Sequence, residues 1–276
     1  MSPYEQGTSF DLSARFHGGT GAMMLVRYNE SPVGQSDLIT ALLPAEGVAT
    51  KTQGSGPYDE LLLVPGYFSF IAQGGETVYH HVITRIYVST PDSIKNGRFN
   101  WGIPKHLANF QFSTPEDDKR SMHVAVSFPS STATPFFKAI LRDSRMTPLA
   151  MPISTSMIDS FLARKVTRGF SFQLAQPPLP DPTNANEASI KATAAGEELS
   201  WLVGTSKTLI VKPVSSGKAK MCWIVPDIAD ATGAFGDGNG FPQLKFLCGG
   251  RGSHLVSFDM EFPVPVELCS HQLGST

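Results

Sequence analysis

The chain has 276 residues, a formal net charge of −2 and only 17% charged residues, where globular proteins average roughly 25%. Without a basic surplus it lacks the electrostatic footprint of a protein that binds phosphate backbones, so we expect no nucleic-acid partner. Its 25 Gly and 21 Pro residues interrupt the sequence too often for a helical bundle. These values favour a turn-rich protein built mainly of strands.

Runs of β-branched and aromatic residues, bounded by clusters of turn-forming residues, predict strands along the whole chain. They lie at 22–28, 58–71, 78–88, 108–112, 122–128, 170–175, 207–214, 219–225 and 254–262. Their spacing predicts a large, mostly antiparallel sheet system. Segment 135–142 fits a strand or a helix equally well, because its periodicity does not distinguish the two.

Helices are expected to be few and short. Cap and stop signals predict them at 36–43, at 90–97, where Thr90-Pro91-Asp92 begins a turn that Gly97 ends, and at 155–165. The small, flexible residues that follow the first helix make 35–57 a candidate lid over a site, with a plain surface excursion as the alternative. The Pro-rich stretch 176–189 predicts an extended surface loop.

The cysteine pattern and the absence of targeting signals bear on location. Cys222, Cys248 and Cys269 form an odd, widely spaced set, which is unlike a secreted disulfide framework. The first residues lack the basic start and apolar core of a signal peptide, and no window approaches about 18 uncharged apolar residues. We therefore expect a cytoplasmic protein with no membrane partner. Because no His/Cys/Asp spacing resembles a zinc site, we expect no metal and no cofactor.

The segment GRFNWGIPKHLA at 97–108 contains an unusually placed lysine. Lys105 directly follows a proline and is surrounded in sequence by large apolar residues. Burial among such groups disfavours the charged amine and lowers its pKa, which is what a Schiff-base nucleophile requires. The alternative is a lysine whose stem covers apolar surface while its amine reaches water.

This segment resembles the signature of the acetoacetate decarboxylase-like proteins, which runs Gly-Arg, four residues with an aromatic, then Pro-Lys, a basic residue and Leu. Two further elements agree with the family in order and separation: Gly56-Pro57-Tyr58-Asp59-Glu60 upstream and Ser253-His254-Leu255 downstream. The resemblance covers roughly residues 20–268.

The resemblance implies a fold and a set of site residues. It implies one domain over 1–276, mostly β, with a closed, cone-like antiparallel barrel and a few short helices. Lys105 matches the family's Schiff-base lysine, and Glu60 matches an acidic residue that points into the same pocket. Homo-oligomers are common in the family, and a small-molecule substrate is implied.

The sequence also departs from the family at two positions. His106 stands where many members have a second lysine, so a neighbouring cation contributes less to activating Lys105. The family's carboxylate-binding arginine has only Arg27 as a candidate, after a shift of the alignment, which favours a larger and more apolar substrate than acetoacetate. We expect Arg27, Tyr58, Trp101 and His106 around the substrate.

The predicted activity is that of a lyase acting through Lys105 on a keto acid or another β-dicarbonyl compound in small-molecule metabolism. The outcome is decarboxylation, or aldol condensation with dehydration, because both proceed through an enamine. Two alternatives remain open from sequence: a pericyclase-like cyclase or isomerase that acts by cavity shape without covalent lysine chemistry, and a non-catalytic small-molecule binder.

Overall fold

The structure is a computed structural model that describes residues 15–18, 22–28, 58–129, 134–144, 149–160, 171–179, 204–227, 234–243 and 251–270. For 15–18, 22–28, 251–259 and 270 it describes the backbone alone. The predicted helix at 36–43 and the candidate lid at 35–57 lie outside the described residues.

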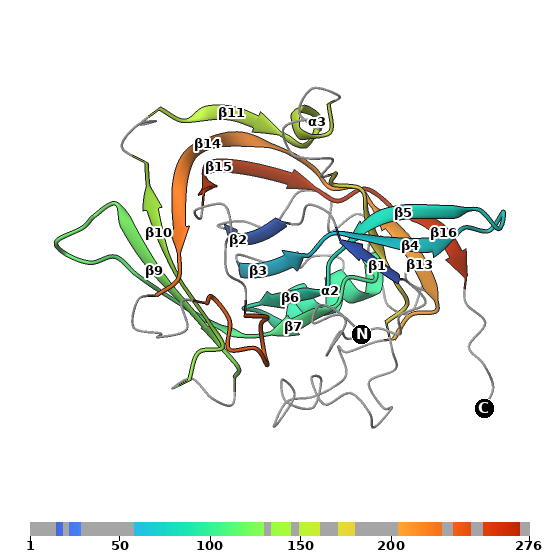
Figure 1. The fold of residues 1–276 in the computed structure, drawn as a ribbon, viewed down its shortest axis with the longest axis horizontal. Coiled ribbons are helices and arrows are strands. Elements are labelled where there is room, and N and C mark those ends of the chain that lie inside the picture. Colours follow the sequence, from blue (N-terminus) through green and yellow to red (C-terminus); the bar gives the residue numbers. More distant parts are fainter. Residues whose placement is uncertain are drawn as a thin grey trace. The chain divides into compact units, whose positions relative to one another are not determined.

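The described residues form sixteen strands and two helices, whose labels are those of Figure 1. The strands are β1 Arg15–Gly18, β2 Ala22–Tyr28, β3 Tyr58–Val64, β4 Tyr67–Ile71, β5 Thr77–Val82, β6 Arg85–Val88, β7 Lys105–Leu107, β8 Asn109–Ser113, β9 Ser121–Ser127, β10 Phe137–Asp143, β11 Met151–Ser154, β12 Leu174–Gln176, β13 Lys207–Val211, β14 Val214–Val225, β15 Arg251–Glu261 and β16 Val266–Ser270. The helices are α2 Pro91–Trp101 and α3 Thr155–Ile158.

The chain divides into two compact units, each assembled from separate stretches of sequence. Unit 1 comprises 1–107, 155–215 and 260–276, and unit 2 comprises 108–154 and 216–259. The chain enters unit 2 immediately after β7, the strand that begins with Lys105. The single domain expected over 1–276 stays a prediction.

Unit 1 contains two sheets. One has six strands in the order β1-β4-β5-β12-β13-β16, and the other has four in the order β2-β3-β6-β7. The six-stranded sheet buries an apolar cluster of Phe68, Phe70, Val82, Ala175 and Ile210. Helix α2 packs against β6 and β7 of the four-stranded sheet, and Figure 1 shows it beside them.

Unit 2 consists mainly of one sheet with the order β11-β14-β10-β9-β8, in which β15 also pairs with β14. Strand β14 is twelve residues long, and this length lets it pair with β11 near its start and with β10 near its end. Figure 1 shows β14 as a long curved strand with β15 alongside.

The prediction of a mostly β protein with few, short helices is confirmed, whereas the closed, cone-like barrel is not. The described strands form three separate sheets, none of them closed. Two of the pairings, β5 with β12 and β6 with β7, are parallel rather than antiparallel. Strand patterns show which residues lie in strands but not which strands pair, because period-two alternation is the same for either partner.

Two local predictions change. Helix α2 continues past Gly97 to Trp101 and is capped by Gly102, whose φ of 61° lies in the left-handed region that glycine tolerates. The beginning of the predicted surface loop 176–189 is buried, because Gln176 ends strand β12 and Leu179 is only 2% exposed. Segment 135–142 resolves as a strand, β10.

The two described helices are both too short to cross a membrane.

Candidate active site

The side-chain amine of Lys105 lies in the interior of unit 1 and has three polar neighbours. Lys105 is 3% exposed. Its Nζ lies 3.0 Å from Oε2 of Glu60, donates a hydrogen bond of 3.0 Å to Oγ of Ser93 and donates one of 3.2 Å to the hydroxyl of Tyr58. These three acceptors match the three N–H donors of a lysine ammonium. The site therefore holds the charged amine with its hydrogen-bonding capacity filled.

The sheet register explains why Tyr58 and Glu60 meet the lysine. Residues two apart in a strand share a face, so Tyr58 and Glu60 of β3 point the same way. Glu60 pairs with Val88 in β6, and Val88 pairs in turn with Leu107 in β7. Lys105 lies two residues before Leu107 and shares its face. The carboxylate and the amine thus lie diagonally across β6 on one side of the sheet.

Helix α2 supplies the third neighbour and the space for the side chain. Ser93 and Gly97 are four residues apart, so they lie on one face of the helix. A Cβ atom added to Gly97 would lie 2.6 Å from Cδ and 2.9 Å from Cε of Lys105, closer than packed carbon atoms approach. The absence of a side chain at Gly97 therefore leaves room for the aliphatic chain of Lys105. This explains why a glycine lies inside the helix, although it lowers helix stability by about 1 kcal/mol relative to alanine.

The rest of the Gly-Arg to Pro-Lys segment fixes the backbone around the lysine. Arg98 is fully buried, and its Nη1 donates a hydrogen bond of 3.3 Å to the carbonyl oxygen of Lys105. After Gly102 reverses the chain, the N–H groups of Gly102 and Ile103 donate to the carbonyls of Arg98 and Gly97, each at 3.1 Å. The segment is therefore a compact unit that sets the start of β7.

The charge state of Lys105 differs from the sequence expectation. Burial lowers its pKa, as predicted, but the adjacent Glu60 carboxylate and Tyr58 raise it by more, so the pKa lies above its ordinary value. The expected lowering of the Lys105 pKa is wrong, because the apolar neighbours in the sequence do not reveal the buried counter-ion Glu60. Burial raises the pKa of Tyr58 as well, so its phenol stays protonated.

The other predicted substrate residues do not join this cluster. His106 follows Lys105 in β7 and therefore lies on the opposite face of the strand, next to Tyr87 at 6.2 Å between ring centroids. Burial and the guanidinium groups of Arg98 and Arg85 hold its pKa well below the ordinary value, so the imidazole is neutral. His106 therefore supplies no cation beside Lys105.

Trp101 and Arg27 are placed by their own contacts. The indole of Trp101 is buried, donates a hydrogen bond of 3.1 Å to the carbonyl of Pro263 and packs against Phe262, so it anchors the end of α2. In β2 the backbone of Arg27 pairs with Asp59, whereas Val26 pairs with Glu60. The backbone register thus keeps Arg27 out of the row that contains Glu60.

Sequence reasoning found the amine, the acid and the tyrosine but missed Ser93 and the role of Gly97. The available signal was their separation of four residues in a segment already predicted to start as a helix. The sequence prediction ends the helix at Gly97, so a shared helix face with Ser93 does not follow from it. In the described part of the chain, no three His, Cys, Asp or Glu side chains are grouped as a metal ion requires.

Comparisons with known proteins give similarity in structure alone. No family model matches the sequence, and no curated protein matches it. An acetoacetate decarboxylase structure from Legionella pneumophila is similar at 14% identity and a TM-score of 0.46, covering 95% of this chain and 90% of that chain. A second acetoacetate decarboxylase structure is similar at 12% identity and a TM-score of 0.42, covering 96% and 93% respectively.

Proposed function

We propose that this protein is a lyase that uses Lys105 as a Schiff-base nucleophile on a keto acid or another β-dicarbonyl compound. The observation that carries the proposal is the ion pair between Lys105 and Glu60, 3.0 Å long, whose side chains are only 4% and 5% exposed. Burying two opposite charges gives little or no net stability compared with an apolar pair of the same volume. A chemical role is a direct reason to keep both groups in the interior.

Glu60 is proposed as the base that frees the amine. The ammonium of Lys105 has no lone pair, so it cannot attack a carbonyl carbon until a proton leaves. A substrate carbonyl near Nζ takes the place of the Ser93 or Tyr58 hydroxyl, and the proton of the N–H that faces Glu60 passes to its carboxylate. The neutral amine then forms the C–N bond, and the carbonyl oxygen takes up the proton from Glu60.

The subsequent steps balance when one water is released, one proton is taken up and one water is consumed. The carbinolamine loses water to give a protonated imine. When the bond to the carboxylate breaks, its electron pair moves into the imine, CO₂ leaves and an enamine remains. A proton adds to the enamine carbon, and water hydrolyses the imine to release the ketone and the amine. The same enamine adds to an aldehyde in the aldol outcome, which loses water afterwards.

The contact of Arg98 favours a bulky substrate over a small one. Arg98 is bound to the backbone carbonyl of Lys105, and the backbone register places Arg27 opposite Asp59 and not opposite Glu60. Arg98 is thus engaged by the protein backbone and is not placed to clamp the carboxylate of a short keto acid, as a bidentate arginine does. We therefore infer a larger substrate that is held mainly by apolar contact.

Homo-oligomeric assembly and a cytoplasmic location stay predictions.

Reductive trapping tests the proposed function. The full-length protein is incubated with acetoacetate or benzoylacetate and borohydride, then digested with trypsin. A modified Lys105 blocks cleavage before His106, so the adduct appears on a peptide spanning 99–119, between the cleavage sites after Arg98 and Lys119. We expect more adduct with benzoylacetate than with acetoacetate.

The exposed Lys207 is the internal control, because its side chain is 54% exposed and it reports on non-specific labelling. A Lys105→Ala variant should lose both the adduct and any CO₂ release. If that variant, shown to be folded by circular dichroism, still releases CO₂ from a substrate that leaves no adduct on wild-type protein, the covalent mechanism is wrong.

A further inference from the structure

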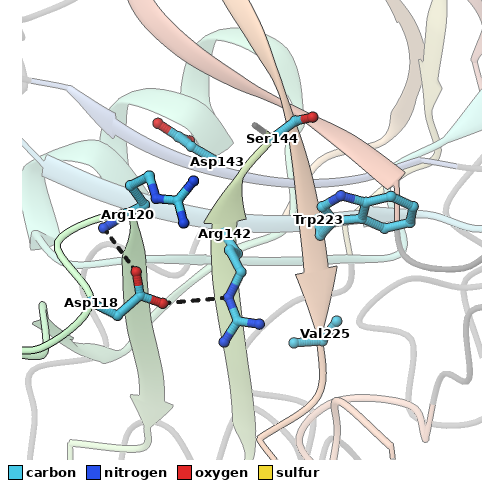
Figure 2. A pocket seen from close by; sticks show the side chains of 7 residues that line it. All are labelled: Asp118, Arg120, Arg142, Asp143, Ser144, Trp223 and Val225. Atoms are coloured by element: carbon cyan, nitrogen blue, oxygen red, sulfur yellow. Dashed lines mark hydrogen bonds and ion pairs between the residues drawn. The ribbon is translucent and has the colours of Figure 1, made fainter. Parts of the chain in front are cut away.

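Unit 2 contains a pocket of about 550 Å³ that includes none of the residues discussed above. It is lined by Asp118, Arg120, Arg142, Asp143, Ser144, Trp223 and Val225, drawn in Figure 2. Its volume lies within the range of small-molecule sites, which is roughly 300–1,000 Å³. The lining combines a large aromatic ring with two guanidinium groups, so its chemistry is independent of the lysine in unit 1.

The register of three strands places the main groups in one row. Arg142 of β10 pairs with Ser121 of β9 on one side and with Trp223 of β14 on the other. Directly paired residues of antiparallel strands share a face, with Cβ atoms roughly 4.5–5.5 Å apart. Val225 lies two residues beyond Trp223 and faces the same way. Arg142, Trp223 and Val225 therefore share one face of the sheet.

Among the described residues, the guanidinium of Arg142 is oriented by contacts at its Nε. Its Nε donates a hydrogen bond of 3.0 Å to Oγ of Ser121 and lies 3.6 Å from Oδ2 of Asp118. Asp118 is held in turn by the hydroxyl of Ser121 and by the backbone N–H of Arg120. The two terminal nitrogens of Arg142 form the end edge of the guanidinium, beyond Nε, and Figure 2 shows one of them on the side away from Asp118. That edge presents two parallel N–H donors.

The formal charges around the pocket are balanced. Hydrogen bonding to Ser121 and the nearby arginines lower the pKa of Asp118, so its carboxylate is charged. Arg120 and Arg142 therefore face Asp118 and Asp143. Within the described residues the guanidinium of Arg120 forms no ion pair, so it can contact a ligand. Because net charge does not select the ligand, the direction of the Arg142 guanidinium and the aromatic ring beside it carry the proposal.

We propose that this pocket binds a planar aromatic carboxylate. The carboxylate lies on the free edge of Arg142, where two parallel N–H···O bonds match its geometry. The ring stacks against the indole of Trp223, whose side chain is 38% exposed. Arg120 adds attraction from the side. Because unit 2 supplies every group, the proposal does not depend on the function proposed for Lys105.

Calorimetric titration of the full-length protein with naphthoate tests the proposal. We expect measurable binding that Arg142→Gln weakens by about tenfold or more, since a charged hydrogen-bonded pair is lost. Trp223→Leu should weaken it by about fivefold. Lys218→Gln is the matched control, because Lys218 is an exposed cation on β14 that faces away from Trp223 and should leave binding unchanged.

Two related compounds test the chemical class. Naphthalenemethanol keeps the ring without the charge and should bind at least about tenfold more weakly than naphthoate. Naphthyl phosphate tests the choice of anion, and tighter binding of the phosphate would overturn the assignment to a carboxylate. The proposal as a whole fails if wild-type protein does not bind naphthoate, or if Arg142→Gln binds it equally well while melting at the wild-type temperature.

Discussion

Two Lys–Glu ion pairs in unit 1 have the same chemistry and opposite surroundings. Lys105 and Glu60 are 3.0 Å apart with side chains 4% and 5% exposed. Lys207 and Glu267 are closer, at 2.6 Å, but 54% and 30% exposed. Water screens the second pair, so the shorter contact contributes less to stability and its loss by mutation should cost less. Burial, rather than distance, distinguishes a candidate reactive amine from an ordinary surface lysine.

The largest expected effect comes from breaking the buried pair. Lys105→Met leaves the Glu60 carboxylate buried without its counter-ion and should lower the free energy of unfolding by about 3–5 kcal/mol, whereas Lys207→Met should change it by less than about 1 kcal/mol. Urea titration measures both. The double variant Lys105→Met/Glu60→Leu should recover most of the loss, because an apolar pair removes the uncompensated charge. Equal costs for the two single variants would contradict the comparison.

The next effect concerns the space that the buried amine occupies. In Gly97→Ala the new methyl group would meet the lysine stem at 2.6 Å, so the side chain must move and the hydrogen bonds to Ser93 and Tyr58 must weaken. We expect a loss of about 1–3 kcal/mol of stability together with loss of trapping at Lys105. Gly74→Ala is the matched control, since nothing lies within 4 Å of its added Cβ. If the Gly97→Ala variant still forms the reduced adduct on Lys105, the space at Gly97 is not required for the reaction.

A pH experiment tests whether the Glu60 carboxylate controls the charge of Lys105. In wild-type protein the pKa of Lys105 is raised, so the pair contributes stability below the unfolded value of about 10.4, which is lost as pH rises through the folded pKa. In the Glu60→Gln variant, burial is the largest remaining influence on Lys105. The pKa of Lys105 in the folded protein should therefore fall below its unfolded value. Stability attributable to Lys105 should then decline as pH falls from about 10.4 towards the folded pKa.

The measurement is the unfolding free energy of both proteins from about pH 8 to about pH 10. We expect Glu60→Gln to lose up to about 1.4 kcal/mol per pH unit on lowering the pH within that window, and wild-type protein to show no such loss from Lys105. Parallel profiles would mean that Glu60 does not control the charge of the amine.

The smallest effect is the response of the two pairs to salt. Raising the ionic strength to about 1 M shortens the screening length to about 3 Å, so the small stability difference of Lys207→Met should vanish. The larger cost of Lys105→Met should persist, because buried charges are screened much less. A large salt dependence of the Lys105→Met cost would indicate that water reaches the buried pair.

The sequence was sufficient for most of the strands and for the reactive residues but not for their partners. Residue patterns located most of the described strands, although they missed β1, β7, β11 and β16 and left β10 undecided. The Pro-Lys element located Lys105, because it is a local signal like the strand patterns. The barrel was not confirmed, since sheet closure depends on pairings between distant strands. The raised pKa of Lys105 was missed for the same reason: it depends on Glu60, forty-five residues earlier in the chain and adjacent only after β3, β6 and β7 pair.

The turn between α2 and β7 has a consequence for insertions and deletions. The chain leaves the helix at Gly102 and begins β7 at Lys105, so only Ile103 and Pro104 lie between. Removing one of them would move each residue of β7 by one position and bring the imidazole of His106 to the place of the amine. The number of residues from Gly97 to Lys105 is therefore as restrictive as their identities, and distant relatives with the same site should preserve this spacing even where the intervening residues differ.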